Sequence, residues 1–127
     1  MRGEILSLAF GESRTIPATD EAKNHMKQLV TKGYFDEQRD VWTLGAALGI
    51  ALDKTYERGK RETFQNVNSL DPEGVFAAIM VGLHPEMTPE ERLKKLVDHA
   101  EFGVREIFRK IEKGTFDWSS LGDSGID

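Results

Sequence analysis

The sequence predicts a mainly α fold: a compact four-helix domain over residues 1–115 that begins with a short β element. Three observations support this prediction. Apolar residues recur at helical spacing through four long runs, capping residues precede the runs, and glycines follow three of them. With 127 residues, 39% of them hydrophobic and 31% charged, the chain has the size and composition of one globular domain. Residues 116–127 are expected to form an acidic C-terminal tail.

The first 33 residues predict two short extended segments and then a helix. Leu6, Leu8 and Phe10 alternate within residues 4–10, which is typical of a strand. Residues 13–17, with the sequence SRTIP, form a second extended candidate that ends at a proline. Thr19 is then placed to cap a helix over 19–32, and Gly33 ends it.

The second predicted helix starts after Asp36 and runs to about residue 56 or 58. It contains the run DVWTLGAALGIALD, in which Gly45 and Gly49 stand four residues apart on one face. Each interior glycine costs a helix about 1 kcal/mol relative to alanine. Two glycines on one face therefore predict that another backbone packs closely there.

The second half of the chain predicts a loop or short strand near residues 63–67 and then two more helices. Asp71 and Pro72 start a helix over 72–83 that is apolar on most sides, with a stripe of small residues at Gly74, Ala78 and Gly82. Such a helix is expected to be central or to lie in an oligomer interface, so we expect a dimer or larger homo-oligomer. The last helix, 89–113, follows a capping box that begins at Thr88.

Charge and cysteine content limit the classes of function. The chain contains no cysteine, which excludes disulfides and thiolate metal sites and leads us to expect a cytoplasmic protein. No apolar run approaches the roughly 20 residues that span a bilayer, so no membrane association is expected. The three histidines, at 25, 84 and 99, lack the spacing of metal ligands. We expect no metal and no cofactor.

A basic cluster makes the first half of the chain the candidate nucleic-acid surface. Residues 1–61 hold 10 basic and 9 acidic residues, whereas residues 62–127 hold 7 and 13. The basic residues gather at Lys54, Arg58, Lys60 and Arg61, where a polyanion would bind. The alternative is that these side chains only solvate the end of a helix.

The order of elements in residues 13–57 also resembles a ribbon-helix-helix module. In that module, strands from two subunits pair and enter the major groove. Arg14 and Thr15 would then read bases, and Arg39 would lie near the DNA backbone. Three carboxylates at residues 36, 37 and 40 oppose phosphate binding, so a plain helical hairpin remains the alternative.

No catalytic constellation is visible, so we expect a non-catalytic protein. The pairs Glu90–Glu91 and Asp98–Glu101 are interpreted as solvated helix faces rather than as acid/base pairs. The serines lack the context of a nucleophile elbow, and the glycine-containing turns lack the full phosphate-loop pattern.

Residues 34–108 resemble the small Dnd system-associated proteins, which accompany DNA phosphorothioation and its restriction genes. The shared motifs are FDEQRDVWTLGAALGIA, GKRETF and KKLVDHAEFGVREI. The matching positions are Asp40, Val41, Ala46, Ala47 and Gly49, then Gly59, Arg61 and Phe64, then Ala100 and Gly103. The resemblance implies an accessory or regulatory role in a DNA modification or defence system, without catalytic residues. The alternative is an oligomeric protein-interaction subunit that does not contact nucleic acid.

Overall fold

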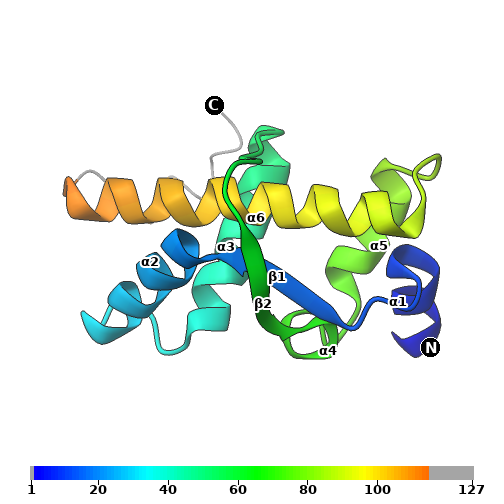
Figure 1. The fold of residues 1–127 in the computed structure, drawn as a ribbon, viewed down its shortest axis with the longest axis horizontal. Helices are drawn as coiled ribbons and strands as arrows, with labels where there is room; N and C mark the ends of the chain where they lie inside the picture. The colour runs from blue at the N-terminus through cyan, green and yellow to red at the C-terminus, as the bar shows by residue number, and fades with distance from the viewer. Residues whose placement is uncertain (1, 115–127) are drawn as a thin grey trace.

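Helix α6 (Pro89–Glu112) is the longest element, and the other elements are arranged along it (Figure 1). The computed structural model describes residues 2–114, and the expected acidic tail over 116–127 lies outside them. The other elements, in chain order, are α1 (Arg2–Phe10), β1 (Thr15–Thr19), α2 (Asp20–Thr31), α3 (Gln38–Leu52), β2 (Arg61–Asn66), α4 (Val67–Leu70) and α5 (Val75–Leu83). The mainly α class is confirmed, but the described residues form six helices rather than four.

Helix α1 replaces the strand that we predicted over residues 4–10. Alternation in so short a window also fits a helix, because Ile5, Leu6, Ala9 and Phe10 fall on one helical face. Ala9 and Phe10 are buried, and α1 packs against α5 and α6. Leu8 projects away from this contact and is 59% exposed, which explains why the alternation did not mark the buried side.

Strands β1 and β2 form a two-stranded antiparallel sheet within the chain. Thr15 pairs with Asn66 at one end, and Thr19 pairs with Arg61 at the other. The register shifts between Ile16 and Pro17, where a proline lacks the N–H that a regular ladder needs. β1 thus pairs with β2 of its own chain, unlike the strands of a ribbon-helix-helix module, which pair between subunits. An extended segment is confirmed here, but it spans Thr15–Thr19 and continues through Pro17, where we expected it to end.

Capping residues fix the start of α2, and a left-handed residue ends α3. The Thr19 hydroxyl accepts the N–H of Ala22, as expected for the cap of α2. α3 begins with a capping box between Glu37 and Asp40 and ends at Leu52, several residues earlier than predicted. Asp53 adopts φ +53°, a conformation that ends helices, so residues 53–60 form a loop. The basic residues after Asp53 therefore do not share a helix face.

The contact between α3 and α6 is made by backbone atoms. A Cβ at Gly45 would lie 2.7 Å from the N of Val104, and one at Gly49 would overlap the carbonyl of His99. On α6, Gly103 stands directly against the carbonyl of Gly45. The two glycines of α3 thus lie where their spacing predicts a close neighbour, and a third glycine on α6 completes the contact.

Helix α5 starts at Val75 rather than at Pro72. Gly74 is its N-terminal cap residue at φ +73°, and the Asp71 carboxylate accepts the N–H groups of Phe76 and Ala77. Of the small-residue stripe, Gly74 is buried and its Cβ position would meet Ile5, whereas Ala78 and Gly82 are exposed. The stripe therefore faces solvent over most of its length.

One buried arginine joins the ends of three helices. Arg92 on α6 is 7% exposed, and its guanidinium donates to the carbonyls of Leu8, His84 and Pro85. It thereby satisfies C-terminal carbonyls of α1 and α5 that have no partner within their own helices. None of the helices within residues 2–114 is long and apolar enough to cross a membrane.

Candidate functional site

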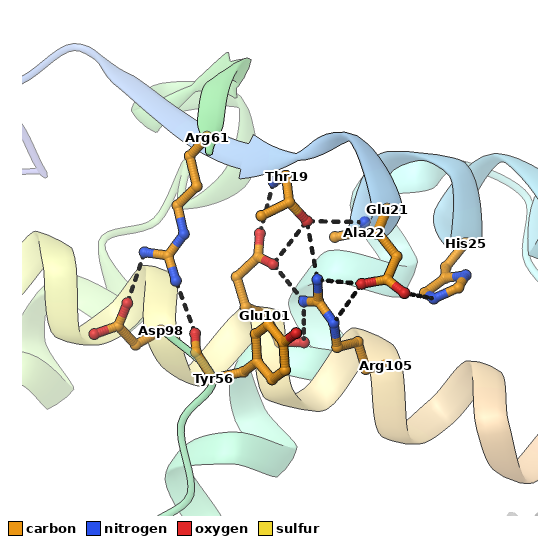
Figure 2. A network of polar contacts seen from close by, with 9 residues as sticks. All are labelled: Thr19, Glu21, Ala22, His25, Tyr56, Arg61, Asp98, Glu101 and Arg105. Atoms are coloured by element: carbon orange, nitrogen blue, oxygen red, sulfur yellow. Dashed lines mark hydrogen bonds and ion pairs between the residues drawn. The ribbon is translucent and has the colours of Figure 1, made fainter. Parts of the chain in front are cut away.

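A network of charged side chains lies between α6 and the strands (Figure 2). Its centre is Glu101, which is 2% exposed. One carboxylate oxygen accepts the N–H of Thr19 at 2.9 Å, and the other accepts the Thr19 hydroxyl at 2.9 Å and the Arg105 guanidinium. The carboxylate thus ties α6 to the residue at which β1 ends and α2 begins.

Arg105 extends the network to α2. Its guanidinium donates to Glu21 at 2.7 Å and to the Thr19 hydroxyl at 3.2 Å, and it lies 3.7 Å above the ring of Tyr56. The hydrogen bond from Arg105 lowers the pKa of Glu21. Burial lowers the pKa of Arg105, but its hydrogen bonds to Glu101 and Glu21 outweigh burial and raise the pKa overall.

A second buried carboxylate, Asp98, holds the start of β2. Asp98 is 3% exposed and accepts from Arg61 at 2.6 Å and from Lys94 at 2.9 Å. Arg61 also donates to the carbonyl of Tyr56 at 2.7 Å. The hydrogen bond with Asp98 raises the pKa of Lys94. The network therefore fixes both ends of the segment from Tyr56 to Arg61.

Two histidines lie on different sides of α6, and burial lowers the pKa of both. His25 on α2 stacks on Phe108 with ring centroids 3.9 Å apart, and its Nε2 lies 3.9 Å from Glu21. His99 is 2% exposed, and its Nδ1 donates to the carbonyl of Lys54 at 2.7 Å. Within residues 2–114, no group of three or more histidine and acidic residues is placed to hold a metal ion.

The network is built to hold the fold rather than to react. Each of its two buried carboxylates accepts at least two hydrogen bonds from the chain itself, so neither presents an unpaired oxygen to a cavity. Asp98 and Glu101 are thus not the solvated helix face that we expected. The sequence signal that was missed is two acidic residues inside the apolar run LVDHAEFGV, where charge must be paired to be buried.

The basic residues predicted to bind nucleic acid do not form one cluster. Arg61 is held in the ion pair with Asp98, and Arg39 pairs with Glu37 at 2.9 Å. Arg14 and Lys60 adjoin opposite ends of the sheet, which are about 13 Å apart at a strand rise of about 3.3 Å per residue. Thr15 is exposed at the same end as Arg14.

Three of the predicted residues lie on the loop over residues 53–60. Lys54, Arg58 and Lys60 are exposed, and Lys60 has Glu62 at 3.7 Å. The loop is anchored to α6 through its own backbone, because Tyr56 donates its N–H to the carbonyl of Asp98 at 3.0 Å. The loop thus carries three exposed cations together with the exposed carboxylates Asp53 and Glu57, and Glu57 pairs with Lys94 at 3.3 Å.

The outer sides of α3 and α5 form an apolar surface. No charged residue occurs in the sequence over 41–52 or over 74–83. The exposed residues on these stretches are Thr43, Ala47, Ala51 and Leu52 on α3, and Val75, Ala78, Gly82 and Leu83 on α5. Val75 and Leu83 are large apolar side chains of α5, and they are 56% and 55% exposed.

A groove joins the two outer helix sides. It has a volume of about 410 Å³ and lies between the first turns of α3 and α5. Thr43, Val75 and Phe76 line it together with the charged residues Arg39, Asp40, Asp71 and Glu73. The ring of Trp42 meets the ring of Phe76 edge-on beneath it, with centroids 5.8 Å apart. The groove therefore connects the N-terminal ends of α3 and α5, and charged residues border it.

No family model, curated protein or solved structure matches the chain. The resemblance to Dnd system-associated proteins rests on the sequence motifs quoted above.

Proposed function

We propose that the protein is a non-catalytic interaction subunit whose contact surface is the joined outer side of α3 and α5. The observation that carries this proposal is the absence of charge over residues 41–52 and 74–83, although eight residues of these stretches are exposed. A groove bordered by charged residues lies between the starts of the two helices and is large enough to receive a side chain. A solvated helix normally has charged or polar residues on its outer side. An apolar surface of this length is expected to be covered by protein in its working state.

The charged network supports the same proposal because it stabilises the contact surface from the opposite side of α6. Glu101 and Asp98 connect α6 to the strands, while the glycines at 45, 49 and 103 connect α6 to α3. A contact surface carried on firmly held helices loses little conformational entropy on binding.

A photo-reactive amino acid placed at Ala47 tests the proposal in cells that produce the protein at its natural level. Ala47 is exposed at the middle of α3, and Thr63 is an exposed control position on β2. We expect Ala47 to yield protein adducts that Thr63 does not yield, with the partner identified by mass spectrometry. Equal labelling from both positions, or no protein adduct from Ala47, would refute the proposed contact surface.

A second candidate function is DNA association through the loop at 53–60, in the accessory role that the resemblance implies. Its support is the group of three exposed cations at Lys54, Arg58 and Lys60. Three phosphate contacts give a slope of about −2.7 in a plot of log affinity against log salt. Fluorescence anisotropy with duplex DNA should show this slope for the parent and no binding for Arg58→Glu/Lys60→Glu.

The control for charge alone is Lys23→Glu/Lys27→Glu on α2, which changes the net charge by the same amount away from the loop. Equal weakening by both double variants would assign the effect to net charge, and binding that persists at high salt would exclude the loop as the DNA contact.

A further inference from the structure

The outer side of α3 has opposite charges at its two ends. At its start, residues 36–40 hold three carboxylates and one arginine, all exposed. At its other end, the left-handed residue Asp53 and the following Lys54 are both exposed, and the backbone of Lys54 is fixed by hydrogen bonds to Gly49 and His99. Between these ends, Thr43, Ala47 and Ala51 stand four residues apart along one exposed line. The surface is thus apolar in its middle and net acidic at its start, and its other end carries Lys54 beside the carboxylate of Asp53.

We infer that this surface binds a second copy of the chain, with the two α3 helices antiparallel about a two-fold axis at Ala47. This inference rests on the proposed function and names its partner. Antiparallel packing places Asp40 of each helix beside Lys54 of the other, and the antiparallel helix dipoles attract each other. A parallel arrangement would instead place like charges together.

The positions along α3 are symmetric about Ala47. Asp40 and Lys54 are equally distant from it in the sequence, and so are Thr43 and Ala51. A two-fold axis at Ala47 therefore pairs Asp40 with Lys54 of the other copy at both ends. It also brings small side chains together along the contact line, so that the helix axes can approach to about 8 Å, the short end of helix packing distances.

The groove beside α3 provides the additional area that a stable dimer needs. A helix of 15 residues is about 22 Å long, and a single strip of that length is smaller than the roughly 800 Å² that each partner of a specific complex buries. In the antiparallel arrangement, Leu52 of the second copy follows the residue that faces Thr43. The inferred arrangement therefore places it at the groove beside Thr43 and Val75, whose border also carries Arg39, Asp40, Asp71 and Glu73. Leu52 is 42% exposed in the single chain and would become buried there.

Engineered cysteines test the register directly, because the chain has none of its own. A disulfide requires Cα atoms within about 4.4–6.8 Å, so only facing positions link rapidly. We expect Ala47→Cys to form a disulfide-linked dimer under mild oxidation. Thr43→Cys should link to Ala51→Cys when the two proteins are mixed, but not to itself. Thr63→Cys on β2 is the exposed control. Linking of Ala47→Cys no faster than Thr63→Cys would overturn the inference.

Asp40 also caps α3, because it accepts the N–H of Glu37. Charge reversal distinguishes this capping role from the inferred pairing of Asp40 with Lys54 of the second copy. Asp40→Lys and Lys54→Glu should each weaken self-association at least ten-fold, because each places like charges at both ends of the contact. Mixing the two variants should restore a dimer, since every charge pair is then opposite. A lost helix cap could not be restored in this way. Sedimentation that shows no heterodimer in the mixture would refute the antiparallel contact.

The experiments distinguish a failure of the proposed contact surface from a failure of the inferred dimer. If the photo-reactive residue at Ala47 captures a different protein and the chain sediments as a monomer, the second copy is refuted while the interaction surface stands. If Ala47 captures only this same chain, both proposals are supported.

Discussion

The two sides of α6 are held by opposite kinds of contact. Towards α3, Gly103 meets the backbone at Gly45, and no charged group takes part in that contact. Towards the strands, Asp98 and Glu101 are buried with their arginine partners. The comparison shows that one helix can contact two neighbours in different ways. α6 contacts α3 through glycines that have no side chain, and it contacts the strands through buried ion pairs.

The two kinds of contact fail in different ways. Close backbone packing leaves no space for an added atom, so its weakness is overpacking. A buried ion pair adds little net stability, because desolvation offsets the attraction, but the loss of one partner leaves an unpaired charge. The predictions below test each contact at its weak point, from the largest expected effect to the smallest.

The largest effect is expected for Gly103→Ala. Alanine favours a helix over glycine by about 1 kcal/mol, but here its Cβ would overlap the carbonyl of Gly45 and force the helices apart. We expect a net loss of about 4 kcal/mol or more, measured by chemical denaturation.

Gly82→Ala is the matched control, because the Cβ position at Gly82 has no atom within 4 Å. This substitution should stabilise the protein by about 0.5–1 kcal/mol. If Gly103→Ala were as stable as the parent, α3 and α6 would not be in backbone contact.

The next largest effect is expected for Glu101→Ala, which breaks the charged side. The guanidinium of Arg105 and the hydroxyl of Thr19 would lose their buried acceptor. The expected loss is about 3 kcal/mol. Glu106→Ala is the control on the same helix, since its pair with Arg109 is more exposed and should contribute less than about 1 kcal/mol. Equal losses from the two variants would show that burial does not strengthen the network.

The glycine contact between α3 and α6 could be predicted from the sequence, because the spacing that indicates it lies within a few residues. Gly45 and Gly49 are four residues apart in a helical pattern, and that spacing alone indicates a close neighbour. The caps at Thr19 and Thr88 were predicted for the same reason, since a capping motif spans only a few residues. The position of α6 followed from the capping box and the apolar spacing.

The buried ion pairs between α6 and the strands could not be predicted from the sequence, because the two partners of each contact are far apart in the chain. Glu101 binds Thr19, which is 82 residues away, and Asp98 binds Arg61, which is 37 residues away. Without these partners, acidic residues on a helix are reasonably interpreted as solvated. Helix α1 was missed for another reason: its sequence has almost no helical amphipathic pattern, because the exposed Leu8 is as apolar as the residues on its buried side.

A smaller effect on the free energy of unfolding is expected from a change of pH. One histidine lies on each side of α6, so the pH dependence of stability can be compared between the two sides. Burial lowers the pKa of both His25 and His99, so the unfolded chain binds protons more readily than the folded one. Stability should therefore fall as the pH falls below about 6.5, the usual pKa of histidine. The groups that face His25 are Glu21, Arg105, Glu101 and Glu112.

Denaturation at pH 7 and pH 5 should show a smaller pH dependence for His25→Phe and for His99→Gln than for the parent, because each variant lacks a histidine whose pKa is lowered by burial. His25→Phe keeps the ring contact with Phe108, so its stability at pH 7 should stay near that of the parent. Glu21 adds a pH dependence only at lower pH. Because its pKa is lowered, the stability that it contributes at neutral pH is lost as the pH falls below the usual carboxyl range. An unchanged dependence in both variants would show that neither histidine is buried in its neutral form.

The smallest net effect is expected when the charged side is made apolar, as the other side already is. Arg61→Met alone leaves Asp98 buried with only Lys94 as a partner, and it should cost about 3 kcal/mol. Arg61→Met/Asp98→Leu removes both charges and keeps similar volumes, so its stability should return to within about 1 kcal/mol of the parent. The carbonyl of Tyr56 loses a donor in both variants, which cancels in the comparison. A double variant as unstable as the single one would mean that the ion pair contributes net stability of its own. Recovery would mean that its role is to select one register of β2 against α6, and amide exchange in residues 61–66 of the double variant would then show faster opening than in the parent.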